Sequence, residues 1–108
     1  MRVKARGYRV ERKVRQIFEK YNWKVIRSGA SLGEADLVCI KKGKCLLVQV
    51  KSTKKKVFYY YDYKKKKLEG MNFYLVVDFG YGKIRILRPK TKIKETDGID
   101  LKGFLRKS

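Results

Sequence analysis

One short segment, residues 45–51, constrains the fold of this chain more than any other. Its first half is apolar, which predicts a buried central strand, but Gln49 and Lys51 interrupt its second half. Because side chains alternate along a strand, these two polar residues project from one face together with Leu47. Charged residues are rarely buried without a partner, so a strand of this kind predicts a chemical site at one end of a sheet.

The segments around this strand predict a helix and a hairpin. Residues 7–21 have apolar side chains at helical spacing, which indicates an amphipathic helix. Its expected buried stripe is Val10, Val14, Ile17, Phe18 and Tyr21. Residues 23–27 alternate as a short strand. Residues 35–40 are expected to form the first arm of a hairpin that turns at Gly43 and returns as the central strand over residues 45–52.

The second half of the chain predicts mainly strands. The aromatic run at residues 58–61 can stack unpaired bases or form a dimer face, and we favour simple alternation in a strand. Residues 62–70 predict a short helix. Residues 72–79 and 83–87 predict a second hairpin, and the segment after Pro89 shows no clear period.

The chain has 108 residues, enough for one domain with one hydrophobic core. The order of the expected elements predicts that this domain, residues 1–108, is an α/β or α+β fold with a mixed sheet. The sequence contains no histidine, which excludes histidine-dependent nuclease and hydrolase mechanisms. Cys39 and Cys45 are too few for a disulfide scaffold or a four-thiolate zinc site, and we expect buried thiols rather than a bridge across the hairpin.

The charge of the chain points to nucleic acid as its partner. Thirty Lys and Arg residues against ten Asp and Glu residues give a formal net charge of +20 at pH 7, which repels itself unless a polyanion is nearby. The lysine runs at residues 54–56 and 64–67 suit phosphate contact. We expect no membrane span and, because no apolar signal core opens the sequence, a cytoplasmic protein.

Four polar residues are expected to converge at one end of the sheet. They are Glu11, Asp36, Gln49 and Lys51. Metal-assisted hydrolysis of a phosphodiester needs such a set, because Asp36 suits Mg²⁺, Gln49 offers a neutral amide oxygen, and Lys51 can orient water or offset charge on the phosphate. A bound metal ion lowers the pKa of its water, which generates a nucleophile without histidine.

The spacing from Asp36 to the Gln49-Val50-Lys51 triplet resembles the PD-(D/E)xK nuclease superfamily, and residues 7–12 and 27–31 resemble segments of archaeal Holliday junction resolvases. The resemblance covers about residues 7–53. It implies a restriction-endonuclease-like fold, a homodimer, and cleavage of four-way DNA junctions with Mg²⁺ or Mn²⁺. The catalytic residues that it implies are Glu11, Ser31, Asp36, Gln49 and Lys51. Of these, it implies Glu11, Asp36 and Gln49 as metal ligands.

Two positions depart from the pattern of the superfamily. Ala35 stands where the pattern has proline, and Gln49 replaces the second acid. The second change removes a negative charge, so weaker Mg²⁺ binding is expected. Some branches of the superfamily, such as the Mrr-like restriction enzymes, have glutamine at this place. Glu34 is close enough in sequence to Asp36 to supply the missing charge.

A set of basic residues near the expected site is predicted to contact DNA. They are Arg9, Arg12, Arg27, Lys54, Lys55 and Lys56. Two rival interpretations stay open, namely a non-catalytic basic protein that binds or coats DNA, and an RNA-binding protein. Each site residue also has an ordinary explanation by itself; Glu11 and Arg15, for example, form a common i,i+4 helix pair. Only the joint pattern indicates a nuclease.

Overall fold

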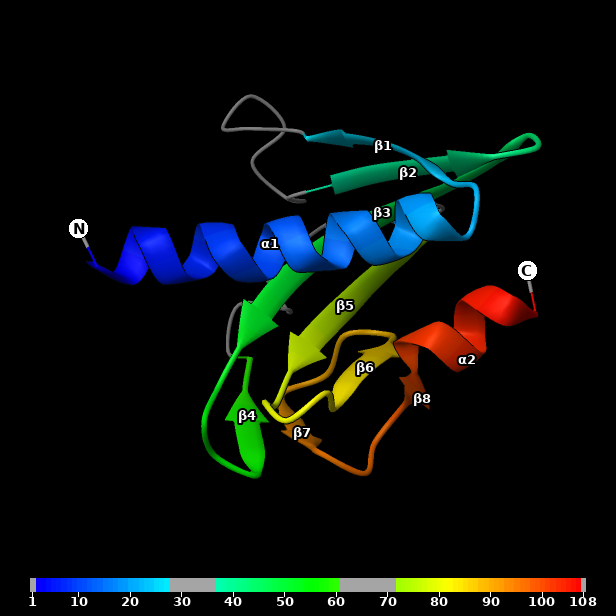
Figure 1. The fold of residues 1–108 in the computed structure, drawn as a ribbon. Coiled ribbons are helices and arrows are strands. Elements are labelled where there is room, and N and C mark those ends of the chain that lie inside the picture. The colour runs from blue at the N-terminus through cyan, green and yellow to red at the C-terminus, as the bar shows by residue number, and fades with distance from the viewer. Residues whose placement is uncertain (1, 28–36, 61–71, 108) are drawn as a thin grey trace.

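The protein is built on a mixed sheet that is packed on both faces (Figure 1). The computed structural model describes residues 2–27, 37–60 and 72–107. The strands of the main sheet are β1 (Lys24–Arg27), β2 (Leu37–Lys41), β3 (Lys44–Ser52), β5 (Phe73–Asp78), β6 (Ile84–Leu87) and β8 (Ile99–Asp100), and they lie side by side in the order β1-β2-β3-β5-β6-β8. Two short strands, β4 (Val57–Tyr59) and β7 (Lys92–Lys94), pair as a separate ribbon.

The first helix, α1, spans Arg2–Lys20 and begins five residues before the predicted start. Val14 and Phe18 are fully buried, and the remaining members of the predicted apolar stripe pack partly against the same core. The ring of Phe18 meets that of Trp23 edge to face at 5.8 Å between centroids. Full burial of such side chains contributes about 1.5–3 kcal/mol each, which is what holds α1 on the sheet. The predicted helical stripe is therefore confirmed.

A two-residue turn joins β2 to β3. Lys42 and Gly43 both have positive φ angles, 47° and 82°, and Lys41 pairs with Lys44 across the turn. This backbone matches the twist of the two strands, which is why tight hairpins favour it. The hairpin was predicted, and each observed arm reaches one residue further into the turn than predicted; residues 35 and 36 lie outside the described part of the chain.

The central strand β3 pairs antiparallel with β2 and parallel with β5. One face of these strands presents Val48, Val50 and Val76 to the core under the helices. The opposite face presents Leu75 and Val77 to the second core, which packs against the β4–β7 ribbon. Since β3 is covered on both sides, any polar residue within it needs a partner or an opening to solvent.

The segment after Pro89, in which the sequence shows no clear period, forms short regular elements. It contains β7, β8 and a second helix, α2 (Leu101–Arg106), all too short to show a period. The Asp100 side chain accepts a hydrogen bond from the Gly103 N–H at 3.2 Å and caps the helix. Leu101 and Leu105, one turn apart, are buried in the same core as α1. The predicted helix at residues 62–70 lies outside the described residues.

The two cysteines differ in burial, and both are free thiols. Cys39 is fully buried, as expected, but Cys45 is exposed beside the β2–β3 turn, so the prediction of two buried thiols was wrong for Cys45. Burial, followed by the nearby Cys45, raises the pKa of Cys39 to about 12. No helix in the described ranges is long and apolar enough to cross a membrane.

Candidate active site

Gln49 and Lys51 lie on the face of β3 that looks away from the helices. Their parallel partners on β5 are Leu75 and Val77, both members of the core on that face. Both polar side chains are only half-buried, unlike those partners. The alternation predicted for this strand therefore places an amide and an ammonium next to each other, two residues apart, toward the carboxyl end of β3.

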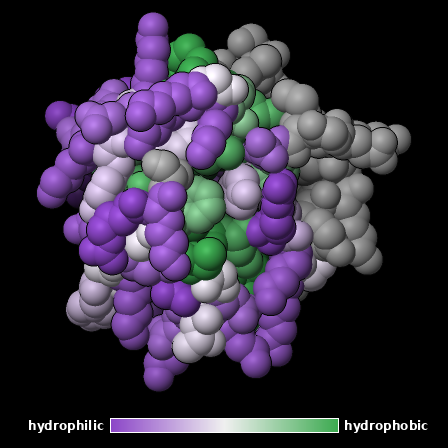
Figure 2. All heavy atoms as spheres, turned by 90° about the vertical axis from the view of Figure 1, so that its right-hand side faces the viewer, coloured by the Kyte–Doolittle hydropathy of each residue, from purple (hydrophilic) through white to green (hydrophobic). Residues whose placement is uncertain are grey.

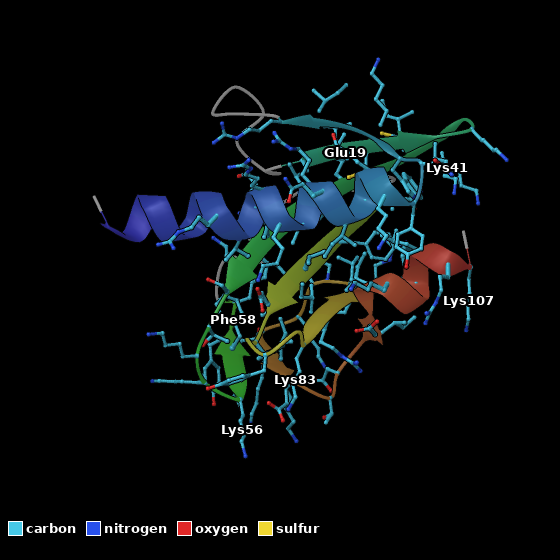
Figure 3. All side chains as sticks on the ribbon, in the orientation of Figure 1. Glu19, Lys41, Lys56, Phe58, Lys83 and Lys107 are labelled. Carbon is cyan, nitrogen blue, oxygen red and sulfur yellow. The ribbon has the colours of Figure 1, made fainter. Side chains whose placement is uncertain are left out.

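A tyrosine holds the Gln49 side chain. The Tyr60 hydroxyl donates a hydrogen bond to Gln49 Oε1 over 2.6 Å, and Tyr60 is only 3% exposed. The backbone N–H of Tyr60 donates to the Thr91 carbonyl at 2.7 Å, which ties it to the segment before β7. Its ring stacks on Phe58 at 6.5 Å (Phe58 is labelled in Figure 3). The amide of Gln49 is thus held by Tyr60, which follows β4 of the β4–β7 ribbon, rather than by a residue of its own strand.

Sequence reasoning missed this contact. Phe58 and Tyr60 pack inward while Tyr59 is 48% exposed, so the predicted strand alternation of the aromatic run is confirmed over these three residues. The alternation of the aromatic run could have indicated this contact, because it places the Tyr60 hydroxyl on the inner side of the β4–β7 ribbon. What the sequence did not indicate is which polar group on β3 the hydroxyl would meet.

Glu11 lies on α1, in the helix layer, and its carboxylate is paired. Arg27 Nε donates to Glu11 Oε1 over 2.5 Å, and the Glu11 side chain is 18% exposed. Arg27 ends β1 and is the register partner of Leu37, the first described residue of β2. Glu11 is thereby held at the end of the sheet where β2 begins. Arg27, predicted to contact DNA, makes this ion pair as well.

Asp36 and Ser31 lie outside the described residues, as do Glu34 and Ala35. The described neighbour of Asp36 is Leu37, which pairs with Val48 on β3, next to Gln49. In the described part of the chain, no three His, Cys, Asp or Glu side chains form a group that could hold a metal ion. Of the predicted metal ligands, Gln49 and Glu11 lie in the described part of the chain, and a Mg²⁺ site of the usual carboxylate type needs the side chain of Asp36 as well.

The other basic residues predicted to contact DNA lie on α1 and in the connection between β3 and β4. Arg9 and Arg12 are exposed on α1, and Lys54, Lys55 and Lys56 are exposed between β3 and β4. Figure 3 shows Lys56 at the outer end of that connection. A further pair was not predicted: Lys13 Nζ lies 3.1 Å from Asp78 Oδ2, and the Asp78 side chain is 6% exposed. Only the tertiary fold brings these two residues together, since 65 positions separate them.

Chemically, this end of the molecule combines oxygen donors with cations. The Gln49 amide and the Lys51 ammonium lie on the face of β3 away from the helices, and the Glu11 carboxylate lies in the helix layer beside Arg27, at the end of β1. Such groups suit a substrate that carries negative charge and that reacts at an oxygen bound to a hard cation.

Comparison with known proteins supports the same interpretation. A family model described as archaeal Holliday junction resolvase (Hjc) matches residues 2–107, far beyond the residues 7–53 on which the sequence resemblance rested. No match is found among curated proteins.

Among solved structures, the Holliday junction resolvase Hjc of the archaeal hyperthermophile Archaeoglobus fulgidus matches with a TM-score of 0.70 and 18% sequence identity. The match covers 94% of this chain and 96% of that chain. The predicted fold class, a small restriction-endonuclease-like domain with a mixed central sheet, is confirmed by this likeness.

Proposed function

The chain belongs to the archaeal Holliday junction resolvase family, and from this we propose that it is a Mg²⁺-dependent endonuclease that cuts four-way DNA junctions. Family membership makes it a nuclease that acts on DNA. The metal ion, the roles of single residues and the homodimer are our proposals. Mn²⁺, which takes similar oxygen ligands, is expected to substitute for Mg²⁺.

The proposed site combines residues of β3 and α1 with Ser31 and Asp36, which lie outside the described residues. Asp36 is the principal carboxylate ligand, Gln49 adds its amide oxygen, and Glu11 binds from the helix layer. A metal ion held by these residues would supply the activation of water for attack on the phosphate. Lys51 orients that water or stabilises the charge that develops on the phosphate. Ser31 completes the site as a hydroxyl donor to the phosphate.

The observation that carries this proposal is the register of β2 on β3. Leu37 pairs with Val48, and Asp36 is bonded to Leu37, so its Cα lies within about 3.8 Å of that of Leu37. Leu37 and Val48 both belong to the core under the helices. If the ladder continues by one residue, alternation directs Asp36 to the opposite face, the face of Gln49 and Lys51.

A dimer follows from the geometry of the substrate. A four-way junction has two-fold symmetry and needs two cuts, whereas a chain of 108 residues offers one site. Two copies related by a two-fold axis present two equivalent sites to the two strands. We therefore propose that the active form is a homodimer.

The function is tested with a labelled four-way junction, a plain duplex and an RNA hairpin, each incubated with Mg²⁺, Mn²⁺ or a chelator. We expect metal-dependent cuts in the junction alone. Asp36→Asn and Lys51→Ala should each slow cleavage by roughly 10²- to 10³-fold, because each removes one group that stabilises the reacting phosphate.

Lys42→Gln is the matched control for Lys51→Ala. Lys42 is exposed in the β2–β3 turn, so its loss changes the net charge equally without touching the site. Equal binding of all three nucleic acids with no cleavage in either metal would contradict the proposal and favour a non-catalytic protein that coats DNA.

A further inference from the structure

A pocket lies where the chain leaves β3 and β5, on the side of the sheet that α1 covers. Its volume is about 460 Å³, within the range of small-ligand sites. Val10 and Phe79 supply apolar surface, Ser52 and Thr53 supply hydroxyls, and Tyr81 forms part of the wall. The pocket begins one residue beyond Lys51, where β3 ends.

A second hollow of about 420 Å³ adjoins the first and is cationic. The two hollows share Val10 and Lys54, and the second adds Arg9 and Lys13. Among the described residues that line them, Asp78 is the only acid. Its carboxylate already receives Lys13 at 3.1 Å and the Gly80 N–H at 2.8 Å. The buried charge is thus compensated within the protein, and the cations at the rim favour an anionic ligand.

Tyr81 is a central residue of the tight turn between β5 and β6, in which the Lys83 N–H donates to the Gly80 carbonyl at 2.9 Å. It is the middle residue of the β5–β6 loop, with a φ of 53°, between Gly80 at 88° and Gly82 at 78°. A side chain at positive φ costs of the order of 1 kcal/mol or more, and glycine or asparagine would avoid most of that cost. Tyr81 gains no packing in return, because it is fully exposed at 103% of the reference area. The hairpin turn accounts for the backbone angle, as it does at Lys42, and what supports a ligand is the exposed aromatic ring, which suits a flat partner outside the protein.

We propose that these two hollows and Tyr81 form a nucleotide-binding site, which we call the β5–β6 loop site. It takes one unpaired nucleotide of a DNA strand. Lys54 and Arg9 bind the phosphate, and the Tyr81 ring stacks on the base. Every base has a π-face, so this contact selects an unpaired base without selecting its sequence.

This inference rests on the proposed function and extends it, since it explains how a distorted junction differs from a plain duplex. In a duplex every base is stacked and paired, and Tyr81 finds no free face. At a branch point a base can leave the stack at a cost of a few kcal/mol, least where pairing is already disturbed. The pocket begins at Ser52, at the same end of β3 as Lys51, but on the α1 side of the sheet, whereas the Lys51 side chain lies on the opposite face. Figure 3 shows Lys56 and Lys83, sequence neighbours of Lys54 and of the loop, at the same end of the molecule.

The test measures binding in chelator, where no cleavage interferes. A fluorescent four-way junction and a plain duplex are titrated with the parent protein and with Tyr81→Ala, Tyr81→Phe and Lys54→Gln. We expect Tyr81→Ala to weaken junction binding by about 5- to 150-fold, the range for loss of one stacked base, and to leave duplex binding unchanged. Tyr81→Phe keeps the stacking ring and should bind the junction within about twofold of the parent. Lys54→Gln should weaken binding to both DNAs, because phosphate contact is independent of base pairing.

Lys42→Gln, which removes one exposed lysine at the distant hairpin turn, controls for the loss of charge. A junction that carries 5-iodouridine at the branch point gives a second readout, since irradiation should cross-link that base to Tyr81 in the parent. If Tyr81→Ala binds the junction as tightly as the parent, the β5–β6 loop site does not exist, while the nuclease proposal still stands. If the parent does not bind the junction at all, the proposed function itself fails.

Discussion

At the scale of single residues, Gln49 sets this chain apart from the acidic pattern of its superfamily. An amide oxygen can bind Mg²⁺ but brings no charge, and the Tyr60 hydroxyl already occupies part of its acceptor capacity. The Tyr60 hydroxyl donates to the amide oxygen and holds the Gln49 side chain beside the Tyr60 ring. Gln49 is therefore held in one orientation, and its metal affinity is limited by charge rather than by disorder.

Restoring the acid at this position should strengthen the metal site. In Gln49→Glu we expect the Mg²⁺ concentration for half-maximal junction cleavage to fall by about tenfold, which corresponds to about 1.4 kcal/mol. This is a cautious figure, since two unit charges 4 Å apart attract by about 4 kcal/mol at an effective dielectric constant of 20. The measurement is a Mg²⁺ titration of the initial cleavage rate.

Tyr60→Phe serves as the matched comparison, because it keeps the buried ring and removes only the donor to Gln49. Loss of one hydrogen bond of about 0.5–1.5 kcal/mol should raise the Mg²⁺ requirement by a few-fold. An unchanged or higher Mg²⁺ requirement in Gln49→Glu would mean that the site is built around the neutral amide.

At the scale of elements, the β2–β3 hairpin contains a buried thiol, that of Cys39, which can lose its proton in alkali. Cys39 is fully buried under the helices, whereas Cys45, six residues later and close to the turn, is exposed. The pKa of Cys39 is raised from 9.0 to about 12, so the folded hairpin keeps this thiol protonated well above neutral pH. The unfolded chain has no such protection.

This difference makes the hairpin sensitive to alkali. As the pH rises above 9, the unfolded state loses the Cys39 proton while the folded state keeps it, so the free energy of unfolding falls until the pH passes about 12. Between pH 8 and 10.5 we expect the parent to lose about 2 kcal/mol more stability than Cys39→Val, at 1.36 kcal/mol per pH unit above 9. Urea denaturation at a series of pH values measures the difference.

Cys45→Val is the control, because this thiol is exposed in the folded protein. The free energy of unfolding of Cys45→Val should fall with rising pH in the same way as that of the parent. Equal profiles for the parent and Cys39→Val would show that the Cys39 thiol ionises as easily in the folded state as in the unfolded one.

The longer elements could be predicted from the sequence, and the shortest could not. The α1 stripe and both hairpins have strong periods or glycine turns, and the sequence predicted them. The short elements after Pro89 are held by tertiary contacts, such as burial of Ile93 against the second core, and local sequence could not indicate them. The same holds for the site. The shared face of Gln49 and Lys51 follows from strand period alone, but the partners Tyr60 and Arg27 depend on how distant elements pack.

At the scale of the whole molecule, a charge of +20 covers a compact body with a radius of gyration of 13.0 Å. Hydrophilic side chains dominate the face drawn in Figure 2, around a small hydrophobic centre. Such a surface binds any polyanion, so charge explains affinity and speed of encounter better than it explains preference for a junction. The preference for a junction over other DNA must come from local features at the site.

Basic residues near the site should contribute more to DNA binding than equal charges far from it. Each neutralised phosphate changes the slope of log K against log salt by about 0.9 on duplex DNA. We expect Lys55→Gln/Lys56→Gln to reduce the slope by up to about 1.8, and Lys42→Gln/Lys44→Gln at the other end to leave it nearly unchanged. Figure 3 shows Lys56 and Lys41, the neighbour of Lys42, at opposite ends of the molecule. Equal slopes for the two double variants would mean that DNA binds without a preferred face.

The parallel pairing of β3 with β5 affects how the chain acquires its structure during synthesis. When β3 leaves the ribosome, α1, β1 and β2 are already available to it, but its partner on the other side follows only after residues 53–72. Until then, one edge of β3, the strand that bears Gln49 and Lys51, has unpaired backbone N–H and C=O groups. These groups can form hydrogen bonds with strands of other chains. The three lysines at residues 54–56, which follow β3 after Thr53, oppose such association by mutual repulsion, in the manner of gatekeeper residues beside aggregation-prone strands.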